Sequence, residues 1–98
     1  MLNEPGWQLF VHVCAKYSHT KDLDALFEVL FTPDEKEQMA LRLLIIQALL
    51  RQAKPQRQLA QELGISIAKI TRGSNALKMM DSHTKTMLKK FFKINSKD

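Results

Sequence analysis

Residues 56–75 read QRQLAQELGISIAKITRGSN, and this stretch decides the fold because it has the pattern of two short helices joined by a tight turn. Apolar residues fall where two helices that cross at a steep angle need contacts, at Leu59, Leu63, Ile65 and Ile70. Ala60 sits where the helices approach closely, and Gly64 permits the backbone of the turn. The pattern predicts a helix-turn-helix over residues 56–78.

The second helix of this unit carries short polar side chains that suit contact with DNA. Its first residues can enter a major groove, where small and polar side chains reach base edges and a lysine reaches phosphates. We therefore assign DNA contact to Gln56, Arg57, Ser66, Ile67, Ala68, Lys69 and Thr71. Basic residues surround this face at Arg57, Lys69, Arg72 and Lys78. The alternative is an ordinary helical hairpin that binds nothing, because glycine-linked amphipathic helix pairs are common.

Charge is distributed unevenly along the chain. Residues 1–40 contain three Lys and Arg against seven Asp and Glu, a net charge of −4. Residues 41–98 contain twelve against three, a net charge of +9. Such an asymmetry indicates a polyanionic partner for the second half, and we expect duplex DNA bound in a salt-sensitive way.

The rest of the chain also reads as helices, because no stretch alternates apolar and polar residues as strands do. The first two helices are predicted from apolar residues at helical spacing, Trp7, Phe10, Val11 and Cys14 before a break at 18–20, then Leu23, Leu26, Phe27 and Leu30. A fourth helix should run from Gln56 to Leu63, a fifth should start at Ile67 behind a Ser66 cap, and Asp81 or Ser82 should cap a sixth.

The third helix has the strongest start signal in the chain. Thr32 can cap its first amides, Pro33 suits the first helical position, and Glu35 can complete a capping box. The helix should run from Pro33 to about Arg51, and from Met39 onward it is apolar on nearly all sides. That composition predicts burial against several elements, including another subunit.

Length and composition limit the remaining choices. The 98 residues have room for one domain, 1–98, in which the helices outside the helix-turn-helix form a dimer core. No apolar run could cross a membrane, no secretory signal is visible, and the lone Cys14 fits a reducing cytoplasm. The histidines and Cys14 lack metal-ligand spacing, and no acid–base pair or nucleophile motif occurs, so we expect no metal and no enzyme.

Three segments together resemble the tryptophan repressor family over about residues 7 to 94. They are Leu30-Phe-Thr-Pro-Asp-Glu, Arg42 in the third helix, and Ile70-Thr-Arg-Gly-Ser-Asn-Ala-Leu-Lys. The resemblance implies an all-α, six-helix fold that forms an intertwined homodimer. It also implies a transcriptional repressor whose operator binding is promoted by the corepressor L-tryptophan. We expect its targets to be genes of tryptophan biosynthesis or uptake.

The resemblance further implies a tryptophan site between the third helix and the recognition helix. Arg42 and Arg72 would flank the indole ring, Arg72 would meet the carboxylate with Thr32 of the partner subunit, and Gly73 would leave space beside the ring. Backbone carbonyls of Val29 and Phe31 of the partner subunit would receive the ammonium group. Taken without the resemblance, Arg42 could instead be an ion-paired or snorkelling side chain, Arg72 a phosphate contact, and Gly73 a close helix packing point.

Three positions depart from the family pattern. Ala76 stands where well-known members have a serine that helps to hold the ligand amino group. The loss of that serine's hydrogen bond would weaken ligand binding by roughly 1.5–3 kcal/mol. Leu41 replaces a threonine and Ala60 a lysine at positions associated with DNA contact. Two alternatives therefore stay open, a constitutive DNA-binding regulator without tryptophan response and a helical protein-interaction module.

Overall fold

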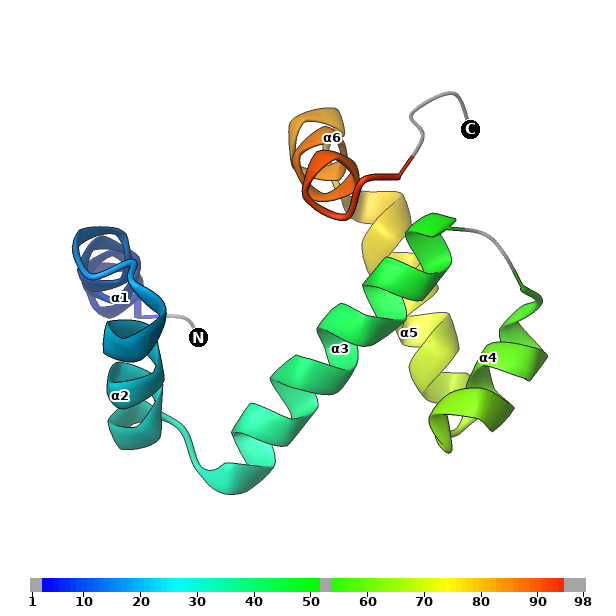
Figure 1. The fold of residues 1–98 in the computed structure, drawn as a ribbon, viewed down its shortest axis with the longest axis horizontal. Coiled ribbons are helices and arrows are strands. Elements are labelled where there is room, and N and C mark those ends of the chain that lie inside the picture. Colours follow the sequence, from blue (N-terminus) through cyan, green and yellow to red (C-terminus); the bar gives the residue numbers. More distant parts are fainter. Residues whose placement is uncertain (1–2, 52–53, 95–98) are drawn as a thin grey trace. The chain divides into compact units, whose positions relative to one another are not determined.

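The computed structural model describes residues 3–51 and 54–94, and these form six α-helices with no strand (Figure 1). The predicted all-α, six-helix architecture is confirmed. By their contacts, the described residues form two compact units, one ending at Glu37 and the other beginning at Gln38. The prediction of one domain over 1–98 stays a prediction.

The first unit contains α1 (Glu4–Lys16) and α2 (Thr20–Leu30), and it ends in the first turn of α3 (Pro33–Arg51). Helix α2 starts inside the expected break at 18–20, because the Nδ1 atom of His19 accepts a hydrogen bond from the Lys21 amide at 3.3 Å and caps the helix. An ion pair of 2.7 Å joins Lys36 Nζ to Glu28 Oε2.

The predicted capping box at the start of α3 is present. The Glu35 amide donates to Thr32 Oγ1 at 3.1 Å, and the Thr32 amide donates to Glu35 Oε1 at 2.8 Å. Each side chain thus satisfies a backbone donor that the helix start would otherwise leave unpaired. Helix α3 begins and ends where the sequence predicts.

Aromatic side chains hold the first unit together. Phe10 lies with its ring centroid 5.4 Å from Trp7, 6.2 Å from Phe27 and 6.0 Å from Phe31, and Phe27 and Phe31 are 5.4 Å apart. Such tilted and edge-on pairs are favourable geometries for aromatic rings. Nevertheless, none of the described residues from 3 to 37 is fully buried.

The second unit has a buried core where α3, α4 (Gln56–Leu63) and α5 (Ile67–Met79) meet. Four side chains form its centre, Ile45, Leu59, Ala60 and Ile70. Ile70 has no exposed surface, as expected for a residue at the crossing of the two helices of a helix-turn-helix. The surrounding half-buried residues are Leu41, Ala48, Leu49, Leu63 and Ile65.

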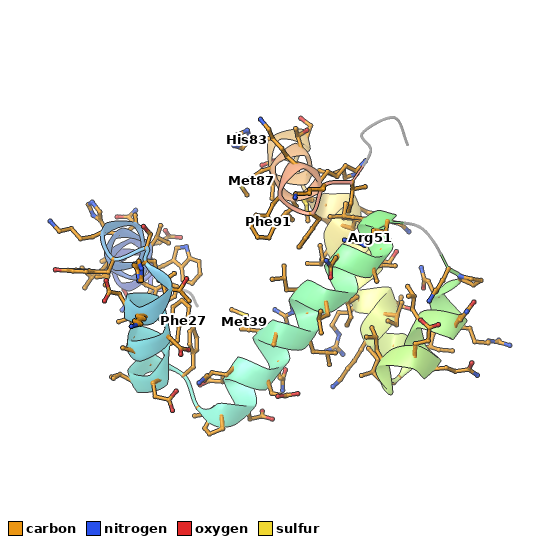
Figure 2. All side chains as sticks on the ribbon, in the orientation of Figure 1. Phe27, Met39, Arg51, His83, Met87 and Phe91 are labelled. Carbon is orange, nitrogen blue, oxygen red and sulfur yellow. The ribbon has the colours of Figure 1, made fainter. Side chains whose placement is uncertain are left out.

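Helix α6 (Ser82–Phe91) completes the second unit, and Asp81 is the residue that caps it. The Thr84 amide donates to Asp81 Oδ1 at 2.7 Å, which decides between the two predicted caps. One turn of α6 separates Met87 from Phe91, and both remain largely exposed (Figure 2). The helix therefore presents an apolar face that the described residues of this chain leave open.

Candidate DNA-reading head and ligand pocket

The turn between α4 and α5 sets the geometry of the candidate reading head. Gly64 has φ 67°, the left-handed conformation in which glycine carries no steric penalty. The amides of Gly64 and Ile65 donate to the carbonyls of Gln61 and Ala60, at 3.2 and 3.0 Å, and close the end of α4. Ser66 then caps α5, its Oγ accepting from the Lys69 amide at 3.3 Å. Helix α4 thus ends at Leu63 before Gly64, and α5 begins at Ile67 after the Ser66 cap, as the sequence predicts.

All residues assigned to DNA contact are exposed. Gln56 and Arg57 lie in the first turn of α4, and the other five occupy the cap and first turns of α5. A helix-turn-helix reads DNA with the N-terminal residues of its second helix, so this exposure is the arrangement that the assignment requires. Contact with DNA itself remains a prediction.

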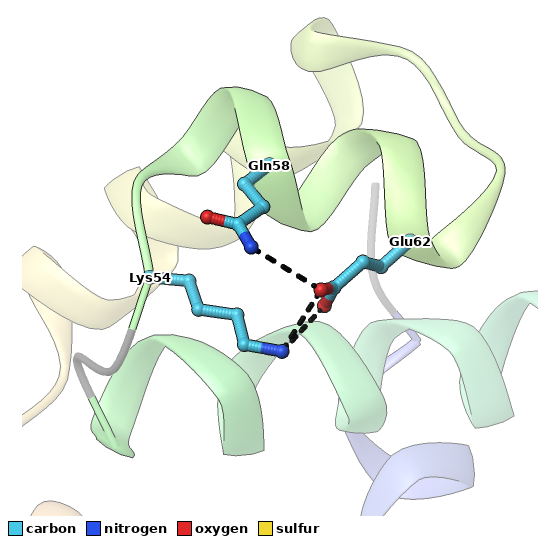
Figure 3. A network of polar contacts seen from close by, with 3 residues as sticks. All are labelled: Lys54, Gln58 and Glu62. Carbon is cyan, nitrogen blue, oxygen red and sulfur yellow. Dashed lines mark hydrogen bonds and ion pairs between the residues drawn. The ribbon is translucent and has the colours of Figure 1, made fainter.

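A polar network ties the segment before α4 to the end of that helix (Figure 3). Lys54 Nζ lies 2.9 Å from both carboxylate oxygens of Glu62, and Gln58 Nε2 donates to Glu62 Oε1 at 3.4 Å. The hydrogen bond and charge of Lys54 lower the pKa of Glu62. By contrast, no described residue forms an ion pair with Arg57, Lys69, Arg72 or Lys78, so these four exposed cations keep their charge available.

A pocket of about 320 Å³ lies between α3 and α5 within the second unit. Its volume is at the small end of the range for small-molecule sites. Each helix contributes residues spaced as i, i+3, i+4 and i+7, Gln38, Leu41, Arg42 and Ile45 from α3, and Lys69, Arg72, Gly73 and Ala76 from α5. This spacing is that of one helical face, so two facing stripes form the walls.

The chemistry of this lining is that of a site for an anion with an apolar body. Three side chains are cationic and four residues are apolar or glycine, and no carboxylate takes part. Guanidinium groups can stack on aromatic faces and can also bind a carboxylate through two parallel hydrogen bonds. An aromatic carboxylate therefore fits this pocket.

Sequence comparisons agree with this arrangement. A sequence model of the family described as Trp repressor protein matches residues 5–91. A Trp operon repressor homolog of Chlamydia caviae is 47% identical over 87 residues, which cover 89% of this chain and 86% of that protein. The homolog of Chlamydia trachomatis serovar D is 45% identical over 87 residues (89% and 93%), and that of Vibrio vulnificus strain YJ016 is 42% identical over 82 residues (84% and 80%).

The chain belongs to the Trp repressor family. The resemblance drawn from the sequence is thus confirmed, and the strand-free, six-helix fold of the described residues agrees with it. This is a family of repressors and not of enzymes.

The structure brings together four of the seven residues assigned to the corepressor of a Trp repressor. Arg42, Arg72, Gly73 and Ala76 all line the pocket. Val29, Phe31 and Thr32 belong to the first unit, and their assignment stays a prediction. The pocket also includes Gln38, Leu41, Ile45 and Lys69, which were not assigned to it. Helical spacing counted from Arg42 and from Arg72 would have indicated Gln38, Ile45 and Lys69.

Gly73 is required by the packing of α3 on α5. A Cβ atom at this position would lie 2.5 Å from Ile45 Cγ2 and 3.5 Å from Leu49 Cδ1. The first distance is far inside van der Waals contact, so an alanine would force the Ile45 side chain or the helix backbones to shift. Gly73 therefore serves close helix packing and also lines the pocket between α3 and α5.

Ala60 and Leu41, two positions at which the resemblance implies a departure from the family pattern, both pack in the second unit. Ala60 is 5% exposed and belongs to the core of the reading head, so its side chain offers no surface to DNA. Leu41 packs against the same core and lines the pocket. Both side chains thus support the core of the second unit, and Leu41 also forms part of the pocket wall.

Within residues 3–51 and 54–94, no His, Cys, Asp and Glu side chains gather in threes or more as a metal ion would need. None of the described helices combines the length and apolar character needed to cross a membrane.

Proposed function

We propose that this protein is a transcriptional repressor that binds operator DNA when L-tryptophan occupies the pocket between α3 and α5. One observation carries the proposal. The cap and first turns of α5 expose Ser66 to Ala68 and Thr71 for DNA, and the same helix lines the pocket through Lys69, Arg72, Gly73 and Ala76. A ligand in the pocket therefore touches the helix that reads DNA. Membership of the Trp repressor family supports tryptophan as that ligand.

In the proposed complex, the indole ring lies between the guanidinium groups of Arg42 and Arg72. Both arginines line the pocket and neither is ion-paired to a described residue, so both are available to stack on the ring. Arg72 also receives the carboxylate, together with Thr32 of the partner subunit. The carbonyls of Val29 and Phe31 of the partner subunit accept hydrogen bonds from the ammonium group.

The proposal includes an intertwined homodimer. The first unit lacks a buried residue among those described, and large apolar side chains such as Trp7, Val11 and Val29 stay exposed in the single chain. Covering them with a second copy would supply the stabilising burial that the unit lacks. Two reading heads in such a dimer would meet successive major grooves, about 34–36 Å apart.

Ligand and DNA are coupled in this account because both act on α5. Tryptophan would favour the arrangement of heads that fits the operator through contacts absent from the other arrangement. We propose genes of tryptophan biosynthesis or uptake as the targets, and the cytoplasm as the location. No metal is invoked.

Selection from a random-sequence duplex library tests the proposal. The full chain is incubated with the library at two salt concentrations, with and without L-tryptophan, and the bound DNA is sequenced and its affinity measured. We expect one enriched, near-palindromic sequence in the presence of tryptophan, with affinity that falls steeply as salt rises. Enrichment that is equal without tryptophan would instead identify a constitutive regulator, the alternative that Ala76 favours. The absence of salt-dependent DNA binding would leave a protein-interaction module.

A further inference from the structure

Helix α4 begins without the side-chain cap that starts every other described helix. Pro55 occupies its N-cap position and makes no side-chain hydrogen bond there, and the first turn of α4 contains no acidic residue. The other five helices each begin at a side chain that accepts a hydrogen bond from a first-turn amide, and these caps are Asn3, His19, Thr32, Ser66 and Asp81. The start of α4 therefore lacks the local restraint that a cap supplies.

A side-chain network spans α4 from the residue before its N-cap to its last turn (Figure 3). Lys54 precedes the helix, and its Nζ atom lies 2.9 Å from both carboxylate oxygens of Glu62, to which Gln58 Nε2 also donates. Residues 54, 58 and 62 are spaced four apart, which places the three side chains along one side of α4. The network thus ties the chain segment that enters α4 to the end of the same helix.

The ion pair in this network contributes little to the stability of the fold. The side chains of Lys54 and Glu62 are both 43% exposed, and exposed ion pairs add little to the free energy of unfolding. The first turn of α4, however, contains Gln56 and Arg57, which we assign to DNA contact. A restraint on the entry into α4 therefore acts on the part of the reading head that approaches the DNA backbone.

We propose that Glu62 is a positioning residue for DNA binding, which holds Lys54 and thereby orients the first turn of α4 toward the DNA backbone. This inference rests on the proposed function. By charge alone, a carboxylate in the reading head should only weaken the binding of a polyanion. The inference predicts the opposite for the operator, because removal of the Glu62 charge also releases the start of α4.

Substitutions that change charge and pairing separately test this role. Glu62→Gln removes one negative charge and breaks the ion pair. Gln61→Lys is the matched control, because it also raises the net charge by one, at an adjacent exposed position of α4 outside the network. The double variant Lys54→Glu with Glu62→Lys keeps the net charge and forms a pair of reversed sign. For each full chain, affinity is measured for the selected duplex and for an unrelated duplex at saturating L-tryptophan.

We expect Glu62→Gln to weaken binding of the selected duplex about two- to fivefold and not to weaken binding of the unrelated duplex. Gln61→Lys should strengthen the binding of both duplexes, and the double variant should regain the wild-type affinity for the selected duplex. If Glu62→Gln binds the selected duplex as tightly as wild type, or if the double variant binds it as weakly as Glu62→Gln, the inference is overturned and the proposed function stands.

Tryptophan binding without DNA and thermal unfolding separate this role from a general structural one. None of the substituted residues lines the pocket, so the tryptophan affinity should match wild type in every variant. A lower thermal midpoint and a loss of tryptophan affinity in Glu62→Gln would show that the pair supports the whole second unit, and would overturn the inference. A wild-type chain that prefers neither duplex would overturn the proposed function and the inference together.

Discussion

The two units of this chain differ in how they are stabilised. The second unit has a core built from α3, α4 and α5, in which Ile70 is completely buried. The first unit relies on ring contacts around Phe10, and its described residues include none that is buried, while Leu9 is 66% and Val29 83% exposed. The comparison teaches that one chain supports the reading head and the pocket, whereas the first unit lacks the burial that the proposed dimer would supply.

The largest expected difference in unfolding free energy is between side-chain truncations in the two units. Ile70→Ala should lower the free energy of unfolding by about 2–5 kcal/mol, because it leaves a cavity in the core of the reading head. Val11→Ala, at a site that is 48% exposed, removes surface that we place in the dimer. Its cost, measured by urea unfolding, should therefore depend on protein concentration. A cost for Val11→Ala that is the same at every concentration would contradict the proposed dimer.

The second prediction compares glycines in the two units. Gly73→Ala should destabilise the protein by about 1–3 kcal/mol through overpacking against Ile45, partly offset by about 1 kcal/mol of helix propensity. Gly6→Ala is the matched control, since its Cβ would meet only Asn3 atoms at 3.4 Å or more. Thermal unfolding should show a loss for the first variant and none for the second. Equal midpoints for the two variants would exclude the packing role of Gly73.

The third prediction concerns helix caps. Thr32→Ala removes the hydroxyl acceptor of the capping box at α3, and Asp81→Ala removes the carboxylate acceptor at α6. Each should cost about 0.5–2 kcal/mol of unfolding free energy in ligand-free protein. Thr32→Ser keeps the acceptor and should retain most of the stability, as measured by chemical denaturation. If Thr32→Ser lost as much unfolding free energy as Thr32→Ala, the methyl group of Thr32 would matter and the hydrogen bond would not.

The smallest effects are those of pH. Hydrogen bonds from Thr84 lower the pKa of Asp81, and the hydrogen bond and charge of Lys36 lower the pKa of Glu28, from ordinary values of 3.8 and 4.5. A group with a depressed folded-state pKa stabilises the fold above its unfolded-state pKa, and this stability is lost as pH falls through the folded-state pKa. As pH falls, the free energy of unfolding should therefore decrease less steeply in Asp81→Asn and Glu28→Gln than in the wild-type protein. Both sites are exposed, so each change is small.

Local signals made most of the fold predictable from the sequence. The capping box at Thr32, the left-handed Gly64 and the Ser66 cap each act within a few residues, so their helices begin or end where the sequence places them. The start of α2 was less predictable, because the ring nitrogen of His19 caps the helix in place of a hydroxyl or carboxylate group.

The pocket was only partly predictable. Arg42, Arg72, Gly73 and Ala76 followed from the family pattern, and the structure brings them together. The contact of Ile45 with Gly73 depends on how α3 crosses α5, which the spacing of residues along one helix does not specify. Lys69 was assigned to DNA because it stands at the start of α5, although its spacing of three residues from Arg72 also places it on the pocket side of the helix.

The central claim is that α5 serves ligand and DNA together. Measuring how tryptophan and DNA change each other's affinity tests this claim most directly. The affinity for the selected duplex is measured with and without saturating L-tryptophan, and the tryptophan affinity is measured with and without saturating duplex. We predict that tryptophan strengthens DNA binding about 5- to 150-fold and that DNA strengthens tryptophan binding by the same factor. If either ligand leaves the affinity for the other unchanged, the account of α5 as a shared helix is contradicted.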